Sequence, residues 1–151
     1  MRALIQRVKN AAVSIDGSVH GAIGAGMLIF VGVRNGDSDN DAQYLARRCA
    51  DLRIFADAAG AMNLSVRETK GSALVVSQFT LYADSRKGNR PSFTDAAAPV
   101  EAEKLYNRFV DSLRGELGQA HVSTGMFRAM MEVSLVNDGP VTIMVESKSP
   151  V

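Results

Sequence analysis

The sequence predicts an α+β fold, and three observations support this class. Several short apolar runs are bounded by turn residues, a pattern typical of β-strands. Two separate stretches carry apolar residues at helical spacing. The strands and helices do not alternate regularly along the chain, as they would in a parallel βαβ array.

The first part of the chain is predicted to form strands. Residues 3–8 and 11–15 are expected to be two strands, and Asp16-Gly17 is a strong hairpin signal before a strand over 19–23. The apolar run 27–33 is predicted to be a buried strand, because it is far too short to span a bilayer.

A helix is predicted to begin after residues 35–38, which break the chain and offer an N-cap. Its apolar stripe consists of Ala42, Leu45, Ala46, Cys49 and Leu52. Cys49 is therefore interpreted as a small core residue rather than a reactive thiol. It is the one cysteine of the chain, so an internal disulfide is impossible and a reducing compartment is expected.

The remaining elements follow from the same signals. A short strand is predicted over 53–56, a turn over 57–60, and the longest clear strand over 73–82. A second helix is expected to begin at Pro99 and to end at Gly115 and Gly118. Its stripe is Ala102, Leu105, Tyr106, Phe109 and Leu113, and the last strands are predicted near 121–123, 131–136 and 141–145.

Composition limits the possible functions. A length of 151 residues fits one domain, and 46% hydrophobic residues are enough for a globular core. The net charge of +1 allows a local basic patch but no general basic coat. Two histidines and one cysteine make a zinc site improbable, so no metal and no cofactor are expected. Arg7, Lys9 and Asp16 interrupt any signal-peptide core, which leaves a cytoplasmic enzyme or binding protein, with no membrane partner.

Two short motifs about sixty residues apart carry the candidate site. In the first, SQFTL at 77–81, Gln78 and Thr80 share one face of the predicted strand and can form a small polar cavity. The alternative is a half-buried strand with a solvated polar face. In the second, NDGPVT at 137–142, Gly139-Pro140 can present a rigid surface without side chains, although a plain hairpin turn is the alternative.

These residues resemble the bacterial D-aminoacyl-tRNA deacylase family. The likeness runs essentially from end to end and is carried by MRALIQRV at 1–8, NLS at 63–65, SQFTLYAD at 77–84 and SLVNDGPVT at 134–142. Ser77 stands where the animal-type tRNA deacylase has a proline, which favours the D-aminoacyl enzyme. Arg128 is a local departure, since a small or different polar residue is frequent there in the family.

The resemblance implies one deacylase domain over residues 1–151, with a mostly antiparallel, barrel-like sheet and two main helices packed against it. Family members hydrolyse the ester between a D-amino acid and the terminal ribose of tRNA. By this likeness Gln78, Phe79 and Thr80 hold the amino acid and the developing oxyanion, and the 2′-hydroxyl of the tRNA assists the attack. Neither His20 nor His121 has an evident Ser or Asp partner, so a catalytic triad has little support.

The family also forms homodimers in which the Gly-Pro unit of one subunit enters the pocket of the other. The resemblance therefore implies that Gly139-Pro140 is cis and, with Ser77, excludes L-amino acids. Glycine lacks the carbon that such a wall would meet, so clearance of glycyl-tRNA(Ala) is also expected.

Arg86, Lys87 and Arg90 follow the first motif, and they are interpreted either as a clamp for the phosphates of the tRNA acceptor end or as an ordinary solvated loop. Arg7 is grouped with these RNA-binding candidates, although its family counterpart bonds backbone carbonyls near the Gly-Pro loop. A non-catalytic RNA-binding dimer of the same fold is the alternative function.

Overall fold

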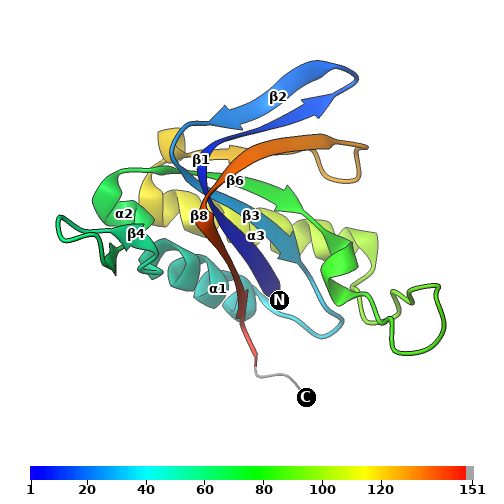
Figure 1. The fold of residues 1–151 in the computed structure, drawn as a ribbon. Helices are drawn as coiled ribbons and strands as arrows, with labels where there is room; N and C mark the ends of the chain where they lie inside the picture. The colour runs from blue at the N-terminus through cyan, green and yellow to red at the C-terminus, as the bar shows by residue number, and fades with distance from the viewer. Residues whose placement is uncertain (149–151) are drawn as a thin grey trace.

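The computed structural model describes residues 1–148, and Figure 1 shows a strongly curled sheet with helices packed on one side. The strands are β1 Arg2–Ile15, β2 Ser18–Ile23, β3 Gly26–Gly32, β4 Phe55–Ala56, β5 Met62–Leu64, β6 Ser72–Ser77, β7 Val122–Thr124 and β8 Glu132–Glu146. The α-helices are α1 Asp39–Asp51, α2 Val66–Thr69 and α3 Pro99–Leu117, and the 3-10 helices are η1 Phe79–Tyr82 and η2 Gln119–His121.

Strand β1 organises the main sheet. It pairs antiparallel with β8 along one edge, while its other edge pairs first with β3 and then with β2. Strands β3, β6 and β7 continue the sheet in parallel pairs. The sheet curls until β2 meets β7, where the Ser123 hydroxyl donates to the Ala22 carbonyl at 3.4 Å. The predicted α+β fold with a barrel-like sheet is thus confirmed, and the sheet is mixed because two of its pairings are parallel.

Two of the predicted strand breaks are wrong. Residues 3–8 and 11–15 belong to the continuous strand β1, and the runs predicted over 131–136 and 141–145 belong, apart from residue 131, to β8. Both halves of β8 pair with β1, and the partners change from Asn137 opposite Val8 to Thr142 opposite Gln6. Because residues 138–141 have no counterparts of their own on β1, they form a bulge, and the hairpin alternative for the second motif is wrong.

Two apolar cores stabilise this arrangement. One lies between the sheet and helices α1 and α3, and it includes Ile5, Leu45 and Phe109. The other lies inside the curl of the sheet, around Leu28 and Leu74. Both main helices therefore cover the same face of the sheet, as Figure 1 shows, and the opposite half of β1 closes over the second core.

The predicted helix ends are largely confirmed. The Asp41 carboxylate accepts from the Ser38 N–H at 2.8 Å and from its hydroxyl at 2.7 Å, so Ser38 caps α1. Burial acts to raise the pKa of Asp41, but these hydrogen bonds outweigh it and hold the pKa at about 2. Pro99 begins α3 and Gly118 ends it. Gly115 lies within the helix, so its prediction as a helix end is wrong.

The cysteine and two short elements were the remaining points of agreement or difference between the sequence and the structure. Cys49 is completely buried in the first core, and burial raises the pKa of its thiol to about 12, as expected for an inert core residue. Strand β5 and the single turn α2 were not predicted. Within residues 1–148, none of the helices is long and apolar enough to cross a membrane.

Candidate functional site

The first motif lies where strand β6 stops. The prediction of a strand over 73–82 is wrong after Ser77, because the Gln78 N–H makes a last bond to the Val31 carbonyl at 2.8 Å and the chain then turns. The 3-10 helix η1 follows, with the Leu81 N–H bonded to the Gln78 carbonyl at 3.3 Å. Ser77 stays half-buried at the strand end, whereas the turn brings Phe79 and Thr80 to the surface.

The turn places polar groups together at the surface. The Gln78 side-chain amide donates to the Thr80 hydroxyl, so the predicted proximity of these side chains is present, although a turn rather than a strand creates it. The N–H groups of Phe79 and Thr80 open the 3-10 helix, where backbone donors have no partner within the helix. The turn can therefore offer two neighbouring N–H donors and one amide to a bound ligand.

An aromatic pair borders these polar groups. The Phe79 side chain is 55% exposed, and its ring packs edge-to-face on Phe93 with 5.0 Å between ring centroids. This arrangement leaves an apolar surface directly beside the Gln78–Thr80 contact, which suits a ligand with both polar and apolar parts.

The second motif is the bulge of β8. Asn137 shapes it from within, because its side-chain oxygen accepts from the Val141 N–H at 3.1 Å and its amide donates to the Thr142 hydroxyl at 2.9 Å. The Gly139-Pro140 peptide bond is cis, and both residues are exposed. The bulge thus presents backbone and a proline ring to the surroundings.

Arg7 of β1 supports this bulge through hydrogen bonds to backbone carbonyls. Its Nε donates to the Asp138 carbonyl at 3.0 Å and its Nη1 donates to the Ile54 carbonyl at 2.7 Å. The space above Arg7 is limited, since a Cβ at Gly139 would lie 2.9 Å from Nη2 of Arg7. Gly139 also has a φ of +127°, a conformation that side-chain-bearing residues rarely adopt.

One chain does not bring the two motifs together. Arg2 donates to the Leu81 carbonyl of η1 at 2.9 Å, and Arg7 holds the bulge, so both motifs are tied to β1. The five residue steps from Arg2 to Arg7 span about 17 Å of strand. Because their spacing is odd, the two arginines project from opposite faces of β1.

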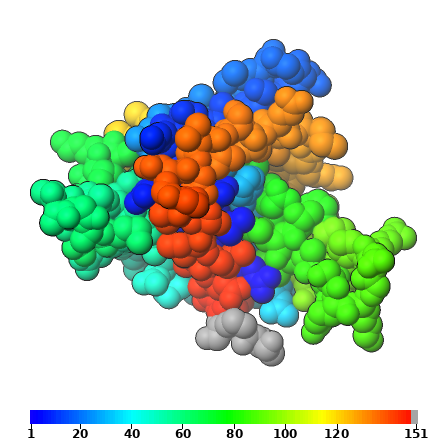
Figure 2. Space-filling view, in the orientation of Figure 1, coloured from blue at the N-terminus to red at the C-terminus, as the bar shows by residue number. Residues whose placement is uncertain are grey.

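The predicted basic residues lie on a loop beyond η1, which projects from the right of the molecule in Figures 1 and 2. Backbone bonds between Asp84 and Ser92, of 2.7 and 2.9 Å, close the base of this loop. Arg86 pairs with the Asp84 carboxylate at 2.7 Å, and its hydrogen bonds hold the pKa of Asp84 at about 2. Lys87 and Arg90 are exposed. The pairing of Arg86 was not predicted from the sequence.

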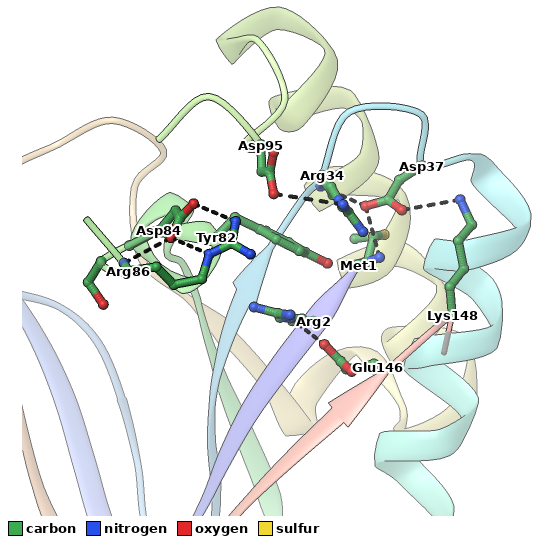
Figure 3. A pocket seen from close by; sticks show the side chains of 12 residues that line it. Met1, Arg2, Arg34, Asp37, Tyr82, Asp84, Arg86, Asp95, Glu146 and Lys148 are labelled. Carbon is green, nitrogen blue, oxygen red and sulfur yellow. Dashed lines mark hydrogen bonds and ion pairs between the residues drawn. The ribbon is translucent and has the colours of Figure 1, made fainter. Parts of the chain in front are cut away.

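A cavity of about 330 Å³, also not predicted, lies where η1 meets the first residue of β1 and the last residue of β8. Figure 3 shows Arg2, Tyr82 and Glu146 on its wall, with Arg2 between the other two. The Arg2 guanidinium pairs with Glu146 and lies 4.6 Å from the centre of the Tyr82 ring. On the far side of the cavity, Arg34 approaches Asp95 at 3.7 Å.

The chain contains two histidines, which are potential catalytic bases and metal ligands. Among residues 1–148, no group of three or more His, Cys, Asp or Glu side chains is arranged to hold a metal ion. His20 is exposed on β2, and His121 at the end of η2 has a buried Nδ1 without a hydrogen-bond partner in that part of the chain. Neither histidine belongs to the two motifs.

Comparison with known proteins identifies close relatives. A family model described as D-Tyr-tRNA(Tyr) deacylase matches residues 4–146. A D-aminoacyl-tRNA deacylase from Geobacter sulfurreducens is 56% identical over 149 residues, which cover 99% of this chain and 97% of that protein. One from Bacillus mycoides is 52% identical over 98% of this chain and 100% of that protein.

Solved structures share the fold. A structure named c-Myc DNA unwinding element binding protein superposes with a TM-score of 0.93 at 37% identity, and the match covers 100% of both chains. A probable eukaryotic D-amino acid tRNA deacylase superposes with a TM-score of 0.82 over 96% of this chain and 98% of that one. Its identity of 18% supports the fold alone.

Proposed function

We propose, from the premise that the chain belongs to the D-Tyr-tRNA(Tyr) deacylase family, that it hydrolyses the ester between a D-amino acid and the terminal ribose of tRNA. Water adds to the acyl carbon, the bond from that carbon to the ribose oxygen breaks, and the ribose oxygen takes up a proton. The products are free D-amino acid and tRNA. The observation that carries the proposal is the exposed turn at 78–80, which combines backbone donors with the Gln78–Thr80 contact.

The turn suits a reaction that develops negative charge on the former carbonyl oxygen. The N–H groups of Phe79 and Thr80 are the donors that we assign to this oxyanion. Removal of one such donor in other hydrolases lowers the rate by about 10²–10³, so two donors on a rigid turn supply a substantial part of the catalysis.

Thr80 is assigned to binding rather than to nucleophilic attack. Its hydroxyl accepts a hydrogen bond from the Gln78 amide, and an amide nitrogen cannot take a proton from it. Within residues 1–148, no His, Asp or Glu side chain is hydrogen-bonded to Thr80. The neighbouring 2′-hydroxyl of the substrate ribose is therefore the group that we propose assists the attacking water.

A second copy of the chain completes the proposed site. Because Arg2, which bonds the turn, and Arg7, which bonds the bulge, lie about 17 Å apart along β1 and on opposite faces, we infer that Gly139-Pro140 does not cover the turn of its own chain. A partner with two-fold symmetry can present its bulge to the turn and receive the other bulge in return. Homodimer formation is thus part of the proposal.

Selection for the D configuration follows from steric exclusion. The exposed Gly139-Pro140 backbone, with Ser77 at the strand end, forms a wall at the Cα of the bound amino acid in the proposed dimer. An L side chain would meet this wall at its first carbon, whatever its later atoms. Glycine has no such carbon, so we propose that mischarged glycyl-tRNA(Ala) is also a substrate.

The exposed loop is proposed to bind the acceptor end of the tRNA. Lys87 and Arg90 reach solvent beyond the turn, and Arg86 joins them while paired with Asp84. Arg7 was grouped with these residues from the sequence, but its guanidinium bonds two backbone carbonyls and its side chain is only 15% exposed. We therefore assign Arg7 to the support of the Gly-Pro bulge. A cytoplasmic site of action is part of the proposal.

A nucleic-acid-binding dimer without catalysis is the second candidate function. The name of one solved relative, c-Myc DNA unwinding element binding protein, favours it, and the basic loop fits both functions. The exposed Gln78–Thr80 contact and the Gly139-Pro140 bulge have a role only in the hydrolase.

The decisive experiment incubates purified protein with matched D-tyrosyl-tRNA and L-tyrosyl-tRNA and measures the free amino acid. We expect rapid release from the D-ester, little from the L-ester, and a dimer in light scattering at the assay concentration. Salt-sensitive RNA binding without ester cleavage would reject the hydrolase in favour of the second function. An active monomer would reject the shared site.

A further inference from the structure

Arg2 occupies a junction between three elements that lie far apart in sequence. It is the first residue of β1, and its guanidinium contacts η1 on one side and Glu146, the last residue of β8, on the other. Figure 3 shows it between Tyr82 and Glu146 on the wall of the cavity. The turn of the first motif is therefore connected to the main sheet through this side chain.

The contact with η1 involves a backbone group that the turn itself leaves open. The carbonyls at the end of a short helix have no partner within it. Nη1 of Arg2 donates to the Leu81 carbonyl at 2.9 Å, and the guanidinium lies 4.6 Å from the centre of the buried Tyr82 ring. A charged donor and a cation–π contact thus act on two consecutive residues of η1.

Glu146 restricts Arg2 to this orientation. The carboxylate pairs with Nε of Arg2, which leaves Nη1 directed at Leu81. Both side chains are partly buried, at 32% exposure for Arg2 and 22% for Glu146. A planar guanidinium can satisfy both contacts at once, whereas a lysine ammonium lacks this fork geometry.

We propose that Arg2, held by Glu146, is a positioning residue for the turn at 79–82 and thereby for the N–H groups of Phe79 and Thr80. This inference rests on the proposed function, because it concerns the alignment of those donors with the substrate. Arg2 acts through the Leu81 carbonyl and the Tyr82 ring and does not touch the substrate. A misplacement of about 1 Å in such a site lowers the rate by about 10²-fold.

The test compares Arg2→Gln, Arg2→Lys and Glu146→Gln with the unchanged protein on D-tyrosyl-tRNA. We expect Arg2→Gln to lower kcat by about 10–100-fold with KM changed by less than about threefold, because the donors act in the transition state. Arg2→Lys should restore part of kcat, and Glu146→Gln should lower it by about two- to fivefold, since glutamine still accepts a hydrogen bond.

Arg67→Gln is the matched control. Arg67 also bonds a backbone carbonyl and a glutamate, donating to the Glu116 carbonyl at 2.8 Å and to its carboxylate at 2.8 Å. It lies on α2, at the end of the molecule where β6 begins rather than where it ends. The kcat of the Arg67→Gln variant should equal that of the unchanged protein. Equal losses of kcat in Arg67→Gln and Arg2→Gln would overturn the proposal, because both would then report general stability.

Amide hydrogen exchange separates this inference from the proposed function. The N–H groups of Leu81 and Ala83 are bonded within the turn, at 3.3 and 3.1 Å, so Arg2→Gln should speed their exchange by about tenfold or more. If the unchanged protein cleaves no aminoacyl-tRNA, the proposed function fails, but faster exchange still supports the positioning of the turn. Unchanged exchange, or an unchanged kcat in an active enzyme, overturns the role of Arg2.

Discussion

The two motifs differ in what they expose and in how the fold holds them. The first is a strand that stops at Ser77 and turns, so that N–H donors and polar side chains face outward. The second is a bulge within the continuous strand β8, where Gly139 and Pro140 expose backbone and a ring. An arginine of β1 bonds a backbone carbonyl in each. Under the proposed function, the first motif performs the chemistry and the second selects the substrate, so mutations should separate rate from selectivity.

The largest expected effect concerns the first motif. Replacing the terminal 2′-hydroxyl of D-tyrosyl-tRNA with hydrogen should lower the rate by about 10²–10⁴, the range of a lost proton-transfer group. Thr80→Ala should lower it by less than about tenfold, because the Gln78 amide cannot activate the hydroxyl. Single-turnover hydrolysis of the normal and the deoxy substrate, by the unchanged protein and by Thr80→Ala, measures both effects. Loss of turnover in Thr80→Ala, with normal cleavage of the deoxy substrate, would make Thr80 the nucleophile.

Gly139→Ala should disturb the second motif. The new Cβ would lie 2.9 Å from Nη2 of Arg7, and the alanine would have to adopt a φ of +127°, so the Arg7 side chain or the bulge must shift. We expect the ratio of D- to L-tyrosyl-tRNA cleavage to fall by about 10–100-fold. Gly60→Ala is the control, since its φ is also positive at +83° but its Cβ would have no neighbour within 4 Å. An equal fall in both variants would show that backbone strain alone is responsible.

Glycyl-tRNA sharpens the assignment of selectivity. If the wall acts on the first side-chain carbon, glycyl-tRNA should be cleaved at most about 10–200-fold more slowly than D-alanyl-tRNA, since the loss of one methyl contact is worth only about 1–3 kcal/mol. Initial rates for the D-alanyl, L-alanyl and glycyl esters of one tRNA provide the measurement. Ready removal of D-alanine with no cleavage of glycyl-tRNA would contradict steric selection.

The smallest effect is expected in the basic loop, which belongs to neither motif. Lys87→Ala and Arg90→Ala should each raise KM a few-fold and reduce the slope of log KM against log salt by about one. Arg86→Ala should have less effect, because Asp84 already pairs with Arg86. Arg47→Ala is the control, on the exposed surface of α1. If the salt slopes of Lys87→Ala and Arg90→Ala equal that of Arg47→Ala, the loop does not belong to the RNA-binding surface.

The sequence predicted the two main helices best, because their caps and apolar stripes are local. It failed where pairing partners decide the structure. The run 73–82 reads as one strand, but the neighbouring strand β3 ends at Gly32 and the chain turns after Ser77. The break at 137–140 reads as a hairpin, but both of its flanks pair with β1. The residues of the candidate site were identifiable from their motifs. The hydrogen bond from Arg7 to the Asp138 carbonyl, in contrast, joins residues 131 positions apart and leaves no local signal in the sequence.

The separation of the two motifs along β1 has a genetic consequence. If each site takes its turn from one chain and its Gly-Pro bulge from another, a chain with a defective turn and a chain with a defective bulge can complement each other. A mixed dimer of Gln78→Ala and Gly139→Ala chains would contain one site with both defects and one site with neither. Each mixed dimer should then keep one site with the unchanged turn and the unchanged bulge, and co-expression of the two variants should restore to it about half of the D-selective activity of the unchanged dimer.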